Sequence, residues 1–145
     1  MKISNEYIRG LVDGEGCFTF YTNTDTDGIK RKIPAFAISM HERDKSLLES
    51  VKHSLGLRNK VYIFKSSISD GAKRGKKAVL VVREFGSLKN TIIPLFYKRL
   101  VGHKGIQFIG WLEKIGQDPL VPESYKLLYR LYKAGYWDRN PKFID

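Results

Sequence analysis

The sequence has little cysteine and no long hydrophobic run. Its single thiol, Cys17, rules out an internal disulfide and a cysteine-based zinc site, so we expect a reducing compartment and a packing role for Cys17. No apolar stretch approaches the roughly 20 residues that cross a bilayer, and the start lacks the pattern of a signal peptide. We therefore expect an intracellular protein with no membrane partner, without a choice between bacterial or archaeal cytoplasm and an organelle matrix.

Acidic residues are also scarce. Fifteen Asp and Glu stand against 26 Lys and Arg, which gives a formal net charge of +11 and a pI near 9.8. This excess indicates a polyanionic partner, although composition alone also fits a merely basic, soluble surface. A length of 145 residues, 42% of them hydrophobic, predicts a single domain over 1–145. The three histidines have no metal-ligand spacing, and no small-molecule cofactor is expected.

Hydrophobic periodicity predicts a short helix over 6–13, with Ser4 or Asn5 as its N-cap and Gly14 and Gly16 ending it. Alternation of apolar and polar residues then predicts strands over 17–23 and 30–40, joined by the polar turn "TDTDG".

The same pattern follows a second time. The segment "HERDKSLLESVKHSLG" predicts a helix that ends at Gly56, and strands are expected over 60–65 and 77–84. Three more helices are expected: one with a break near Pro94, one over 106–115 and one over 125–134. The order αββαββααα predicts an α+β fold, with one four-stranded antiparallel sheet, helices on one face and an extra C-terminal helix.

The segment "YIRGLVDGEGCF" combines closely spaced glycines with two acids. Gly10 and Gly14 are four apart, so on a helix they allow a neighbouring helix to approach closely. If that neighbour is a second copy, Asp13 and Glu15 come near their symmetry mates, and crowded carboxylates of this kind favour Mg²⁺. The alternative is an ordinary turn with surface acids.

The stretch "IRGLVDGEG" at 8–16 resembles the LAGLIDADG motif. The segments "FAISMHERDKSLLESVKHSLG" and "FGSLKNTIIPLFYKRLVGHKGIQF" resemble later blocks of that family, in the same order, so the resemblance covers most of 7–115. The motif positions that match are Gly10, Leu11, Asp13, Glu15 and Gly16.

This family contains homing endonucleases and relatives such as intron maturases, built on an αββαββα half whose sheet lies in the DNA major groove. The resemblance implies a motif helix at a two-fold interface, formed here by Gly10, Leu11, Asp13 and Gly14. It implies that Glu15 binds the metal beside the carbonyl of Gly14, and that Asp13 is structural. It also implies that Lys104 is a catalytic residue near the scissile phosphate.

Because the motif occurs once, the resemblance predicts a homodimer that cuts both strands of a palindromic or nearly palindromic DNA site by Mg²⁺-dependent hydrolysis. Mn²⁺ or Ca²⁺ is expected to substitute for binding. Three positions depart from the family pattern. Arg9 replaces an alanine and either caps the partner's acids or points to solvent, Glu15 replaces the commoner aspartate, and Met40 stands where some relatives carry glutamine.

Alternation along the strands predicts which residues face DNA, although a register error of one residue would exchange each with its core-facing neighbour. The predicted base-facing residues are Thr19, Tyr21, Asn23, Arg31, Ala37, Ser39, Tyr62, Phe64, Lys77, Val79, Val81 and Arg83. The predicted phosphate contacts are Lys65, Lys73, Arg74, Lys76 and Lys77.

Three alternatives stay open from the sequence. The chain could be a DNA-binding regulator on this scaffold that does not cut, or a maturase that binds its own intron RNA. Outside the family, it could be a basic adaptor for an acidic protein.

Overall fold

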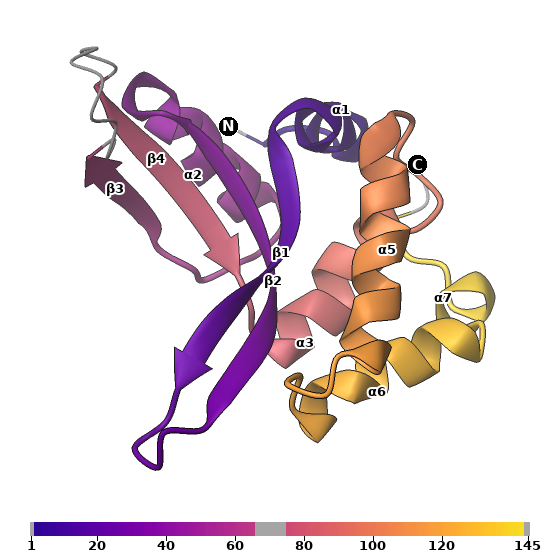
Figure 1. Cartoon of the computed structure of the whole chain (residues 1–145). Helices are drawn as coiled ribbons and strands as arrows, with labels where there is room; N and C mark the ends of the chain where they lie inside the picture. The colour runs from indigo at the N-terminus through magenta and orange to yellow at the C-terminus, as the bar shows by residue number, and fades with distance from the viewer. Residues whose placement is uncertain (1, 66–74, 144–145) are drawn as a thin grey trace.

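The structure is a computed structural model that describes residues 2–65 and 75–143. Figure 1 shows one twisted sheet with the helices gathered on one of its faces. The strands are β1 (Gly16–Thr24), β2 (Lys30–His41), β3 (Val61–Lys65) and β4 (Lys76–Val82). They pair antiparallel in the order β1-β2-β4-β3. The predicted α+β fold with a four-stranded antiparallel sheet is therefore confirmed.

The first helix, α1, spans Asn5–Glu15, and the Ser4 side chain caps it by accepting the N–H of Tyr7 at 3.1 Å. The predicted cap is confirmed, but the predicted end is wrong because the helix runs through Gly14. The residue that follows the helix is Gly16, where an added Cβ would lie only 2.5 Å from Cγ1 of Val12. A side chain does not fit at this junction, so β1 can begin directly where α1 ends.

The turn between β1 and β2 is built by one side chain. The carboxylate of Asp25 accepts the N–H groups of Asp27 and Ile29, each at 2.9 Å. Gly28 has a φ of +78°, a conformation that glycine adopts at no steric cost. The polar turn predicted between the first two strands is confirmed.

The next helical segment consists of a 3₁₀ turn, Glu42–Asp44, and α2, Lys45–Ser54. Leu48 and Val51 are buried, and α2 packs against β4 and β2. Gly56 follows with a φ of +68°, which confirms it as the residue that ends this helix.

The predicted break near Pro94 is wrong. Helical backbone continues through α3 (Phe85–Ser87), the π-helical turn η2 (Leu88–Ile92) and α4 (Ile93–Phe96). In the π turn the N–H of Ile93 bonds to the carbonyl of Leu88, one residue further back than in an α-helix. The wider turn lets the proline enter α4 in its first turn, where its missing N–H costs little.

Two backbone carbonyls of this segment accept hydrogen bonds from side chains of the C-terminal region. Trp137 Nε1 donates to the carbonyl of Lys89 at 3.2 Å, and Lys142 Nζ donates to that of Asn90 at 2.8 Å. The C-terminal region therefore stabilises the π turn.

The remaining helices are α5 (His103–Gln117), α6 (Glu123–Lys133) and α7 (Tyr136–Arg139). The sequence predicted the centres of α5 and α6 but made both helices too short. Gly135, with a φ of +73°, ends α6 as predicted, but α7 follows it directly and was not predicted.

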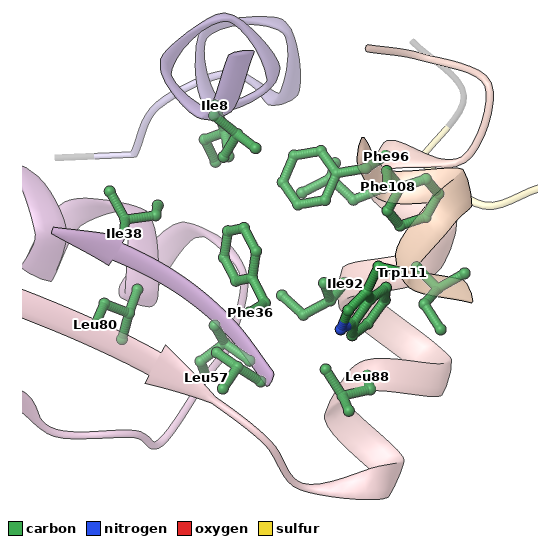
Figure 2. Close-up of a cluster of buried hydrophobic side chains, with 14 of the residues drawn as sticks. Ile8, Phe36, Ile38, Leu57, Leu80, Leu88, Ile92, Phe96, Phe108 and Trp111 are labelled. Carbon is green, nitrogen blue, oxygen red and sulfur yellow. The ribbon is translucent and has the colours of Figure 1, made fainter. Parts of the chain in front are cut away.

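Aliphatic and aromatic side chains together fill the space between the sheet and the helices (Figure 2). The Phe18 ring of β1 lies 4.8 Å from Phe108 and 5.4 Å from Phe36 and from Trp111, between ring centroids. Trp111 also donates its indole N–H to the carbonyl of Thr19 at 2.8 Å. These contacts fix α5 over β1. In the described part of the chain, no helix combines the length and hydropathy that spanning a bilayer requires.

Candidate functional site

The site begins at the junction of α1 and β1. Glu15 is the last helical residue, and both Glu15 and Gly14 are exposed. Within the described residues, no group donates a hydrogen bond or forms an ion pair with the Glu15 carboxylate. Gly14 lies in the last helical turn, where a carbonyl has no i+4 donor within the helix. These hard oxygen atoms, one carboxylate and one carbonyl, suit a divalent cation such as Mg²⁺.

Asp13, two residues earlier, is used differently. Its carboxylate accepts the N–H of Val101 and the N–H of Gly102, both at 3.0 Å. Gly102 is the N-cap of α5, so this contact holds the start of α5 against the end of α1. Asp13 therefore has a structural role within the chain, whereas its predicted role between two copies stays a prediction.

Lys104 lies in the first turn of α5 and is half-buried. Because Asp13 binds the residues just before this turn, the structure brings the element that carries Lys104 to the element that carries Glu15. A cation in the first turn of a helix opposes the helix dipole, so helix stability does not explain a lysine at this place.

The outer side of α1 is open in the described part of the chain. Cβ atoms added at Gly10 and Gly14 would meet nothing within 4 Å, and Tyr7 is 51% exposed. Leu11 is half-buried on the same helix. The two glycines therefore do not serve a close contact among the described residues, and their predicted interface role stays a prediction.

Arg9 is the clearest correction at the motif. It does not point to solvent, because the residue is only 6% exposed, and its guanidinium bonds to carbonyls of its own chain. Its Nε donates to the carbonyl of Leu95 at 2.8 Å, and a terminal nitrogen donates to that of Phe143 at 3.0 Å. Leu95 belongs to the last turn of α4, where helix carbonyls carry partial negative charge. Arg9 therefore joins α1, α4 and the C-terminal segment.

Two other predictions near the site have clear outcomes. Cys17 is exposed, so the predicted packing role is wrong. Strand alternation places its thiol on the face away from the helices. Met40 is partly buried and packs against the core, which leaves no water-positioning group assigned at that position.

The face of the sheet opposite the helices, here called the open face, carries the predicted base-facing residues. The register pairs Tyr62 with Val79, and Phe64 with Lys77, and these residues alternate with buried ones such as Ala78 and Leu80. The same alternation places these predicted residues on the open face: Thr19, Tyr21, Asn23, Arg31, Ala37, Ser39, Tyr62, Phe64, Lys77, Val79 and Val81. Arg83 follows the end of β4 and lines a groove together with Tyr62 and Val81. Ala37 is nearly covered, at 6% exposed.

The predicted phosphate contacts do not all lie on this face. Lys65 pairs with Lys76 across β3 and β4, and strand alternation points both toward the side of the helices, where both are exposed. Lys77 lies on the open face. Lys73 and Arg74 lie outside the described residues.

Comparison with known proteins identifies the fold and the family. A family model described as LAGLIDADG endonuclease matches residues 8–115. Among curated proteins, the "Probable intron-encoded DNA endonuclease 1" of Mycosarcoma maydis is 39% identical over 67 residues, which are 46% of this chain and 24% of that protein. The match thus spans about a quarter of the curated relative's length.

Solved structures give the same result for the fold. The homing endonuclease I-TnaI has a TM-score of 0.58 at 21% identity, covering 92% of this chain and 99% of that one. The meganuclease I-SmaMI, solved bound to uncleaveable DNA, has a TM-score of 0.60 at 27% identity, covering 88% of this chain and 44% of that one. Because the family model matches well over half of its residues, the chain belongs to the LAGLIDADG endonuclease family.

Proposed function

We propose that this chain, as one domain over 1–145, is a site-specific DNA endonuclease that works as a homodimer with bound Mg²⁺. The observation that carries the proposal is the position of Glu15. Its exposed carboxylate has no partner among the described residues and stands where α1 passes into β1, beside the start of α5. A structural role does not account for an acid placed in this way.

Glu15 and the Gly14 carbonyl are the ligands that this chain would offer. Mg²⁺ requires about six oxygen ligands in near-octahedral geometry, so one copy does not complete the site. Among the residues described, no group of three or more His, Cys, Asp and Glu could hold a metal ion. Oxygens of a second copy and of the DNA backbone would supply the rest. A bound divalent cation would activate water and offset charge on the phosphate. The related I-SmaMI was solved bound to uncleaved DNA in the presence of calcium ions.

Lys104 is proposed as the second catalytic residue. The Asp13 contacts hold its helix end beside α1, and its ammonium group would offset the negative charge that develops on the scissile phosphate. The role of Asp13 in this scheme is to position α5.

The homodimer is proposed from the open side of α1. The four-residue spacing of Gly10 and Gly14 would let a second α1 approach closely about a two-fold axis. This axis would place two Glu15 carboxylates together. The chain matches 44% of the I-SmaMI chain, so one unit of this size accounts for less than half of that protein. A two-fold dimer reads a palindromic or nearly palindromic site.

DNA would lie along the open face, with the open-face residues named above turned toward the bases. Lys77 and Arg83 would contact phosphates or base edges, and Lys65 and Lys76 would contact phosphates from the edge of the sheet. The net charge of +11 supports a polyanionic partner. The phosphate roles of Lys73 and Arg74 stay predictions.

The test is cleavage of a library of DNA sites with Mg²⁺, read by sequencing of the cut ends. We expect cleavage at one family of palindromic sites, a loss of at least about 100-fold in Glu15→Gln, and little change in that variant's DNA affinity. Glu42→Gln, which changes an exposed acid in the 3₁₀ turn, is the matched control. Undiminished nicking by Glu15→Gln would overturn the metal assignment. Specific binding without cutting would identify a regulator instead.

A further inference from the structure

The open face carries an apolar patch that the fold does not use. Tyr62 and Phe64 project from the edge strand β3 and are 47% and 52% exposed. Their ring centroids are 6.0 Å apart. Beside them on β4 lie the half-buried Val79 and Val81, and Tyr62 pairs directly with Val79. We call these four residues the apolar floor.

The apolar floor lines a surface groove of about 400 Å³. Cations stand at its borders: the Lys60 ammonium lies 5.6 Å from the centre of the Tyr62 ring, and Arg83 also lines the groove. Lys77 pairs with Phe64 at the other end. Glu84 also lines the groove, with its carboxylate bonded to Asn59 Nδ2, but it is outnumbered by Lys60, Lys77 and Arg83. A ligand that fits this groove is therefore apolar at its centre and anionic at its edges.

The one amide side chain among the described residues that line this groove, of the type that binds adenine at two points, is already occupied. Asn59 Nδ2 donates to the carbonyl of Val81 at 2.9 Å and to Oε1 of Glu84 at 2.8 Å. Its amide is therefore not free to bond to adenine. Phe64, Val79 and Val81 have no polar side-chain atoms, so most of the floor offers only apolar contact.

In the major groove of DNA, the one apolar group on a base edge is the C5-methyl of thymine. Backbone phosphates flank it on both strands, which matches an apolar floor bordered by lysine and arginine. We infer that the apolar floor reads thymine methyl groups, so that each half-site contains a thymine-bearing block facing β3 and β4. This inference rests on the proposed DNA-binding function and adds the base that one part of the sheet selects.

The first experiment compares two randomised pools of duplex DNA, one containing thymine and one containing uracil in its place. Uracil keeps the base pairing and removes only the methyl group. Duplexes bound by the protein are separated at fixed salt and sequenced. We expect the thymine pool to yield a conserved thymine block that loses its information content in the uracil pool, while other positions keep theirs.

The inference would be overturned if the same positions are selected equally in both pools, as thymine in one and as uracil in the other. It would also be overturned if the thymine pool yields no thymine block. An absence of any sequence preference in either pool would instead contradict the proposed function. The two failures are therefore distinguishable, and neither depends on the folding of a variant.

The second experiment tests whether the apolar floor contacts the thymine methyl group. For a selected duplex, replacing one thymine of the block with uracil should weaken binding by the wild-type chain about four-fold, the value of one buried methyl. In Phe64→Asn this difference should disappear. Leu127→Asn, which changes a side chain that is 40% exposed on α6, should keep it. If Phe64→Asn unfolds at the same temperature as the wild type and still binds the thymine duplex four-fold more tightly than the uracil duplex, the apolar floor does not recognise the methyl group.

Discussion

The carboxylate of Asp13 accepts the backbone N–H of Gly102 at 3.0 Å, although the two residues are 89 positions apart. A second bond from the N–H of Val101 makes the contact bidentate. Bonds from N–H groups to an ionised acceptor are among the stronger ones in proteins. One acid of the motif therefore orders the start of α5, whereas the carboxylate of the other acid, Glu15, has no hydrogen-bond partner among the described residues.

Asp13→Asn should separate positioning from chemistry. The amide keeps the shape of the side chain but turns an NH₂ toward one of the two donors, so one backbone N–H loses its acceptor. We expect the free energy of unfolding to fall by about 1–2 kcal/mol, measured by denaturant titration. We also expect the cleavage rate to fall while DNA affinity changes little. Asp27→Asn, an exposed acid in the turn between β1 and β2, is the control. An unchanged unfolding free energy would contradict the positioning role.

The strands and the main helices could be predicted because their signals are local. Alternation of apolar and polar residues along 30–40 and 77–84 indicates which face of each strand is buried. A glycine that follows a segment of helical periodicity indicates the end of a helix. This is why the faces of β2 and β4 were predicted correctly. The boundaries of α5 and α6 were predicted less well, because polar residues in the first and last turns of a helix do not change the apolar pattern.

Other features depend on partners far away in the chain, so no local pattern reports them. The partners of Arg9 are the carbonyls of Leu95 and Phe143, 86 and 134 positions away. The sequence around Arg9 does not indicate which carbonyls its guanidinium will contact. The π turn before Pro94 is hidden from the sequence for the same reason, because its carbonyls accept hydrogen bonds from Trp137 and Lys142, far along the chain.

Arg9→Met should destabilise the fold although the substitution is apolar. Methionine fills a similar volume but leaves the Leu95 carbonyl, bound now at 2.8 Å in a buried place, without this donor. An unsatisfied buried acceptor costs about 1–3 kcal/mol. We expect a loss of that size by denaturant titration, and Arg58→Met, at an exposed position, serves as the control. Equal stability of the two variants would mean that the guanidinium contributes nothing to the fold.

Acid should weaken the link between the segment after α4 and helix α7. The Lys98 ammonium, 2.7 Å from Asp138, and the Tyr97 hydroxyl, at 3.0 Å, hold the pKa of Asp138 below its usual value of 3.8. A carboxyl whose pKa is lowered by folding stabilises the native state above its unfolded pKa, and this contribution disappears as pH falls through the folded pKa.

The measurement compares wild type with Asp138→Asn across pH. We expect the difference in their unfolding free energies to be constant from neutral pH down to the usual carboxyl range and to shrink as the pH falls further. A difference that is the same at acid and neutral pH would assign the effect of Asp138 to something other than its charge.

Gly10→Ala should act in opposite directions on one copy and on the dimer. Within the described chain the new methyl group meets nothing within 4 Å, and alanine favours a helix over glycine by about 1 kcal/mol. The isolated chain should therefore become slightly more stable. A second α1 packed against this glycine would be pushed away, so the dimer dissociation constant, measured by sedimentation, should rise at least ten-fold.

Gly110→Ala is the matched control for this prediction, because Gly110 is also an exposed helical glycine with nothing within 4 Å. It should give the same gain in stability without weakening the dimer. Gly116→Ala should instead lower the stability, since its Cβ would overlap the ring of Tyr129 and must disturb the packing of α5 on α6. If Gly10→Ala and Gly110→Ala leave association equally unchanged, the second copy does not dock on this side of α1, and the two Glu15 carboxylates would have to be brought together in another way.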